Sequence, residues 1–116
     1  MDIRLKRAYE TPDASDGRRI LVERLWPRGV TKETASLDDW MKEIAPSPEL
    51  RKWYGHEPEK WPEFRKRYKK ELSGNGALVE KLRAICESGT VTLIFAAMDE
   101  SRNSAVVLKS VLEGDS

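Results

Sequence analysis

The sequence predicts a small α/β protein with one domain over residues 1–116. We expect a mostly parallel sheet of about three to five strands, flanked by about four to five helices. Apolar runs of strand length occur at 19–23 and 90–98, and segments with helical spacing of apolar residues lie between and after them. The length agrees with one domain, because chains divide into separate cores only beyond roughly 250–300 residues.

The two apolar runs have the composition of strands that are covered on both faces. The first contains Ile20, Leu21 and Val22 in succession, and the second, "TVTLIFAAM", is apolar almost throughout. Such runs are typical of parallel or central strands. Near the N-terminus, Ile3 and Leu5 alternate with basic residues, which indicates a half-buried strand near a sheet edge.

Four segments have apolar residues at the spacing of one helix face: 47–55, 62–72, 77–89 and 105–112. In the first of them, Ser47 is a candidate N-cap and Pro48 suits the first helical position. The segment 37–46 fits either a helix or a short strand. Turn-forming and polar residues predict loops at 10–17 and 30–36.

The composition argues against several classes of function. The 21 basic and 20 acidic residues nearly cancel to a net charge of +1, whereas domains that bind nucleic acid non-specifically usually have a clear basic excess. His56 is the only histidine, so metal sites built on paired histidines are excluded and we expect no metal. No glycine-rich phosphate or dinucleotide motif is present, so we expect no cofactor.

Cys86 is the only cysteine in the sequence, and an unpaired thiol suits a reducing compartment. No apolar run approaches the ~20 residues of a membrane span, and the charged N-terminus lacks the apolar core of a signal peptide. We therefore expect a cytoplasmic protein without a membrane partner. Cys86 falls on the apolar stripe of its predicted helix, where we expect an inert buried thiol. The sequence does not specify the oligomeric state.

Two segments follow predicted strand ends, 23–29 and 98–104, and parallel α/β sheets bind ligands at such ends. The first segment combines two forked guanidinium donors, suited to phosphate or carboxylate, with an indole that can stack on a planar ligand. The second precedes a helix N-terminus, which favours an anion. Our leading hypothesis is a small anionic ligand held by Arg24, Trp26, Arg28, Arg51 and Asn103.

The same segments contain candidates for catalysis, and each has a structural alternative. If the ligand is a substrate, Glu23 or Asp99 is the candidate acid or base. Glu23 can instead pair with an arginine, while Trp26 fills an apolar gap. Asp99 or Ser101 can simply cap the following helix, which we regard as the better explanation. His56, in "YGHEP", is expected to be solvated or to cap a helix end.

A second surface suggests a different function. Basic residues occupy one side of the 62–72 helix, and they are Arg65, Lys66, Lys69 and Lys70. The alternative function is a nucleic-acid-binding module that uses this side, although the balanced net charge does not favour it. A solvated face, with Glu63 paired to Arg67 at i, i+4, explains the same pattern. A non-catalytic protein-interaction domain, with Arg24 and Arg28 in internal pairs, is the remaining alternative.

Three stretches together resemble a known family. They are "SDGRRILVERLWPRGV", "LDDWMKEIAPSPELRKWYGHEPEKWPEFRKRYKKEL" and "LIFAAMDESRNSAVVL". Over nearly the whole chain they are similar to the short, YeaO-like branch of a bacterial and archaeal family, the domain of unknown function 488 (DUF488). The resemblance implies a compact cytoplasmic α/β domain and carries over no activity. Longer relatives carry cysteines that this chain lacks, so it implies no thiol chemistry here.

Overall fold

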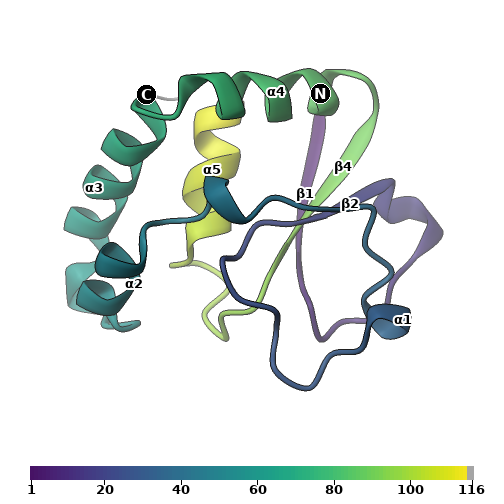
Figure 1. Cartoon of the computed structure of the whole chain (residues 1–116), viewed down its shortest axis with the longest axis horizontal. Helices are drawn as coiled ribbons and strands as arrows, with labels where there is room; N and C mark the ends of the chain where they lie inside the picture. Colours follow the sequence, from purple (N-terminus) through teal and green to yellow (C-terminus); the bar gives the residue numbers. More distant parts are fainter. Residues whose placement is uncertain (115–116) are drawn as a thin grey trace.

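The strands form one parallel sheet. The computed structural model describes residues 1–114, and its four strands lie in the order β1-β4-β2-β3 (Figure 1). The strands are β1 (Asp2–Arg7), β2 (Arg18–Leu21), β3 (Asp39–Trp40) and β4 (Thr90–Phe95). The apolar β4 is central, whereas the alternating β1 lies at an edge. These positions confirm the predicted α/β class.

Five α-helices accompany the sheet in the described part of the chain. They are α1 (Lys32–Ala35), α2 (Pro48–Tyr54), α3 (Trp61–Ser73), α4 (Gly76–Glu87) and α5 (Ser104–Leu112). Short 3₁₀ turns occur at Ala14–Asp16, Lys42–Ile44 and Pro58–Lys60. Helices α2 to α5 lie in the four segments where helical spacing predicts them. As expected, α2 begins with Ser47 as N-cap and Pro48 at its first position.

The main hydrophobic core lies on one face of the sheet. Val91, Leu93 and Phe95 point to this face, because side chains alternate along a strand. Helix α5 packs on the sheet and α3 packs on α5, so the helices form a layer on this side (Figure 1). Tyr68 of α3 is fully buried, and its hydroxyl donates to the carbonyl of Ile44 at 2.7 Å.

The opposite face is covered mainly by the segment 24–37, which contains only the short helix α1. Leu21 and Ile94 form a small second core there, and Trp26 packs against it. The indole N–H of Trp26 donates to the carbonyl of Val30 at 2.6 Å. Both faces of β2 are therefore covered, as its apolar run predicts.

A buried ion pair lies beside the second core. Arg19 and Asp16 are 4% and 5% exposed, and 2.5 Å separates Arg19 Nη1 from Asp16 Oδ2. Lys6 Nζ lies 3.1 Å from the same carboxylate, and Arg19 also donates to the carbonyl of Ala35 at 2.9 Å. Burial raises the pKa of Asp16, but hydrogen bonds from the Asp13 N–H, Lys6 and Arg19 outweigh it, so the pKa is lowered.

Two local predictions are wrong. The segment 30–36 is not a plain loop, because Thr31 and Thr34 cap one another and stabilise the single turn of α1. The last strand ends at Phe95 and not at Met98, so the residues after Phe95 leave the sheet. The ambiguous segment 37–46 resolves into the short strand β3 followed by a 3₁₀ turn. No helix within residues 1–114 is long and apolar enough to cross a membrane.

Candidate ligand-binding site

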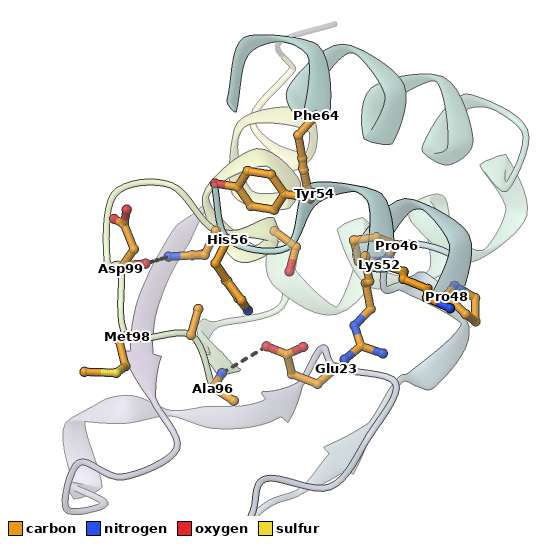
Figure 2. Close-up of a pocket in the computed structure, with 14 residues that line it drawn as sticks. Glu23, Pro46, Pro48, Lys52, Tyr54, His56, Phe64, Ala96, Met98 and Asp99 are labelled. Carbon is orange, nitrogen blue, oxygen red and sulfur yellow. Dashed lines mark hydrogen bonds between the residues drawn. The ribbon is translucent and has the colours of Figure 1, made fainter. Parts of the chain in front are cut away.

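A cavity of about 820 Å³ opens beyond the carboxyl ends of β2 and β4 (Figure 2). Helix α2 and the start of α5 form its other walls. Ligands commonly bind at this end of parallel sheets, and the volume is typical of small-molecule sites. The cavity is lined by Glu23, Pro46, Pro48, Arg51, Lys52, Tyr54, His56, Phe64, Ala96, Ala97, Met98, Asp99, Asn103 and Ser104.

Glu23 lies just after β2, at the strand end of the cavity. Its carboxylate oxygen Oε2 accepts the backbone N–H of Ala96 at 2.9 Å. Its own backbone carbonyl accepts the indole N–H of Trp40 at 2.6 Å. The other carboxylate oxygen, Oε1, has no hydrogen-bond partner among the described residues, and Figure 2 shows the carboxylate facing the open space of the cavity.

Burial and the neighbouring groups have opposite effects on the pKa of Glu23. Burial raises the pKa of Glu23. The Ala96 N–H and the nearby Arg51 and His56 side chains lower it, but by less, so the net pKa is raised. Neither Arg51 nor His56 forms an ion pair with Glu23 in the part of the chain that the structure describes. A half-buried carboxylate therefore faces two basic side chains across the cavity.

Helix α2 is anchored before it reaches the cavity. The hydroxyl oxygen of Ser47 accepts the N–H of Leu50 at 3.1 Å, which caps the helix. Glu71 of α3 accepts both the N–H of Ser47, at 2.9 Å, and its hydroxyl, at 2.6 Å. The first turn of α2 is thus tied to α3, and Arg51 and Lys52 project from a fixed backbone.

Arg51 and Lys52 place two positive charges on the cavity wall. Both are exposed, and neither side chain has an ion pair or a hydrogen bond within residues 1–114. The sequence reasoning named Arg51 but missed Lys52. The available signal was an adjacent Arg-Lys pair on a short helix that begins with Ser-Pro.

His56 follows α2 in a left-handed backbone conformation. Its φ is +58°, and Gly55 before it has a φ of +53°. Histidine is enriched among the few non-glycine residues with positive φ. The ring centre of His56 lies 6.0 Å from that of Tyr54, and in Figure 2 the imidazole points into the same space as the Glu23 carboxylate. The side chain is exposed, as a solvated histidine is expected to be.

The loop before α5 satisfies its own polar groups. Asp99 accepts the N–H groups of Ser101 and Arg102 at 2.9 and 3.0 Å and pairs with the Arg102 guanidinium at 3.2 Å. These contacts, led by the Ser101 N–H, lower the pKa of Asp99. Asn103 accepts the N–H of Val106 at 3.1 Å and donates to the Asp99 carbonyl at 2.9 Å. The prediction that Asp99 or Ser101 caps this helix is wrong, because the helix begins directly after Asn103.

The described residues that line the cavity include no thiol, and they form no cluster arranged to bind a metal ion. Cys86 lies in α4 and is 1% exposed, which confirms the expected buried thiol, and burial raises its pKa. Within residues 1–114, no group of three or more histidine, cysteine or acidic side chains is arranged to hold a metal ion.

Comparison with known proteins assigns the chain to a family. Residues 2–116 match the family described as "Inactive DUF488-N3 subclade". The chain belongs to this DUF488 family. The uncharacterised protein YeaO of Escherichia coli K12 is 43% identical over 108 residues, covering 93% of this chain and 94% of YeaO. The uncharacterised protein Rv3073c of Mycobacterium tuberculosis H37Rv is 43% identical over 112 residues, or 97% and 94%. No solved structure matches the chain significantly.

In the structure of this DUF488 domain, the residues predicted for the site fall into two groups. Glu23, Arg51, Asp99 and Asn103 all line the large cavity, whereas Arg24, Trp26 and Arg28 do not. Arg24 donates to the carbonyl of Pro46 at 2.9 Å and lines a smaller hollow of about 350 Å³. Trp26 belongs to the second core, and Arg28 is exposed on the 24–37 segment.

The basic residues of α3 lie outside the large cavity of the DUF488 domain. They are Arg65, Lys66, Lys69 and Lys70. The Arg65 guanidinium lies 5.9 Å from the ring centre of Trp61. Glu63 and Arg67 form an ion pair at 2.9 Å, as their i, i+4 spacing predicts. Arg67, which is not one of these four residues, is therefore already paired within the helix.

Proposed function

We propose that this DUF488 domain binds a small ligand with a phosphate or carboxylate group in the cavity beyond β2 and β4. The observation that carries the proposal is the pair Arg51 and Lys52, which line the cavity and form no ion pair or side-chain hydrogen bond within residues 1–114. A guanidinium can hold phosphate or carboxylate through two parallel hydrogen bonds. The start of α5 adds a dipole that favours negative charge. Pro46, Phe64 and Met98 supply apolar contacts.

The proposed function is binding without turnover. The matched family is described as inactive, and we extend that description to this chain. Of the two carboxylates predicted as acid or base, Glu23 has an oxygen without a partner in the described chain, whereas both oxygens of Asp99 already accept hydrogen bonds. We also propose that the protein works in the cytoplasm, because the unpaired thiol of Cys86 suits a reducing compartment.

Calorimetric titration of phosphate esters and polycarboxylates against two double variants tests the proposal. We expect Arg51→Ala with Lys52→Ala to weaken binding by about 10- to 100-fold, because hydrogen bonds to charged groups are lost. The charge-matched control, Lys32→Ala with Lys66→Ala, removes two exposed lysines outside the cavity and should bind as the wild type does. A wild type that binds none of the compounds, or a cavity variant that binds them equally well, rejects the proposal.

A further inference from the structure

We infer that the ligand carries neutral hydroxyl donors beside its anionic group, and that Glu23 receives them. The ligand class is then a hydroxylated phosphate ester, such as a phosphorylated polyol or sugar, and not a simple anion. This inference rests on the proposed function, because it assumes that Arg51 and Lys52 hold the anionic group.

The first argument is the unfilled acceptor of Glu23. An ionised carboxylate accepts hydrogen bonds at about four positions and donates none. Ala96 fills one of these positions at 2.9 Å, and no other described residue supplies a donor. Among the described residues, no side-chain oxygen is both fully buried and without a partner, so water can reach this oxygen, and a ligand that displaces the water has to supply donors in its place. A ligand with only acceptor oxygens at this end would be repelled.

The second argument concerns the charge of the donor. The acidic side chain of the cavity without an ion pair in the described residues is Glu23, and the lysine and arginine side chains without one are Arg51 and Lys52. Asp99 is already paired with Arg102. Glu23, Arg51 and Lys52 therefore give the lining one positive charge in excess. An ammonium group on the ligand beside Glu23 would also lie near the Arg51 guanidinium, which acts electrostatically on Glu23, so a neutral hydroxyl is favoured over an ammonium.

The third argument is the size and surface of the cavity. At about 820 Å³, it is far larger than an inorganic anion requires, and it lies within the range of sites for whole organic ligands. Phe64 and Met98 contribute apolar surface to its lining, against which the carbon skeleton of a polyol or sugar ring can pack. The ligand's anionic end would then lie near α2 and its hydroxylated end near β2.

The test compares three phosphate esters that share the anion and differ at the other end: glycerol 3-phosphate, propyl phosphate and 2-aminoethyl phosphate. We expect calorimetry to show glycerol 3-phosphate binding about 10- to 100-fold more tightly than propyl phosphate, the usual effect of hydrogen bonds to a charged acceptor. The aminoethyl ester should not exceed glycerol 3-phosphate. Glu23→Gln should reduce this preference, and Glu23→Ala should abolish it, while both still bind propyl phosphate.

The outcomes separate the inference from the proposed function. If binding of all three esters requires Arg51 and Lys52, the proposed function stands. The inference still fails if glycerol 3-phosphate binds no more tightly than propyl phosphate. It also fails if glycerol 3-phosphate keeps its advantage in Glu23→Ala. Tighter binding of the aminoethyl ester also overturns the inference. If no ester binds, the inference is rejected, and the proposed function is rejected with it only if the polycarboxylates also fail to bind. Circular dichroism confirms that each variant is folded, and Glu23→Gln preserves the shape of the side chain if Glu23→Ala does not fold.

Discussion

The backbone N–H of Ala96 donates to the carboxylate of Glu23 at 2.9 Å, across 73 positions of the chain. This bond joins the residues that follow two neighbouring parallel strands and orients the carboxylate at the strand end of the cavity. It also leaves one oxygen of Glu23 directed at the cavity, in a place where burial raises the pKa. An ionisable group kept in such a position destabilises the fold, and perturbed carboxyl groups in cavities are candidates for function.

Replacing Glu23 by glutamine should stabilise the protein at neutral pH. The folded pKa of Glu23 lies above its ordinary value of 4.5, so the wild type loses stability as the pH rises from that value through the folded pKa. We expect Glu23→Gln to have the higher melting temperature at pH 7, and the difference to shrink near pH 4. Glu49→Gln, an exposed control on α2, should show no such dependence. A Glu23→Gln variant less stable at pH 7 would contradict the argument.

Removing Asp16 should destabilise the fold strongly. Asp16→Ala leaves Arg19 buried without its carboxylate, a loss that typically costs about 3–5 kcal/mol in the free energy of unfolding. Because the folded pKa of Asp16 is lowered, its stabilising contribution is present above the unfolded pKa and is lost as the pH falls through the folded value. Denaturant titrations of both proteins should therefore differ most at neutral pH. The exposed Asp2→Asn serves as control, and equal loss in the two variants would refute the role of burial.

Gly17 should tolerate no side chain. Its φ is +67°, and a Cβ would lie 2.3 Å from the carbonyl oxygen of Thr90 at the start of β4. We expect Gly17→Ala to cost about 3 kcal/mol or more, from backbone strain and a clash that neither strand can relieve. Gly76→Ala is the matched control, because it lies in α4 with open space around it and should be neutral or slightly stabilising. Chemical denaturation measures both.

Nucleic acid should bind weakly and only at low salt. The basic side of α3 is small, the net charge of the chain is +1, and contacts with a few phosphates lose affinity steeply as salt rises. Fluorescence anisotropy with single- and double-stranded DNA should show no binding at about 150 mM salt. Micromolar affinity that persists at this salt and disappears in Lys66→Ala with Lys70→Ala would instead establish the nucleic-acid alternative.

Much of the fold is predictable from patterns along the chain. The apolar run of β4 predicts a central strand, and the alternating pattern of β1 predicts an edge strand. Ser47 followed by Pro48 predicts the start of α2. The turn of α1 does not follow from the apolar pattern, because reciprocal capping by two threonines stabilises it locally within a polar segment. The end of β4 was misplaced because Ala96 and Ala97 are apolar enough to continue a strand, while their surroundings in the fold are a cavity wall.

The candidate site was only partly predictable, for a reason of geometry. Glu23 and Asn103 both follow parallel strands, so the sequence predicts that they lie at the same end of the sheet, where both line the cavity. Arg24 and Arg28 have the right chemistry, but the chain leaves the sheet after Leu21, so Arg24 reaches the carbonyl of Pro46 and Arg28 lies exposed in a turn. The cations that do line the cavity come from α2, and no sequence pattern states which end of the sheet a helix covers.

The attachment of Ser47 to Glu71 has a consequence for how a ligand would be received. Since α2 is held against α3 before anything binds, the backbone that carries its two cations is already in place at the moment of association. Binding would then cost chiefly the rotamer freedom of Arg51 and Lys52, about 0.5–1.5 kcal/mol for each side chain. A domain built this way can retain a weakly interacting metabolite with little rearrangement of its backbone.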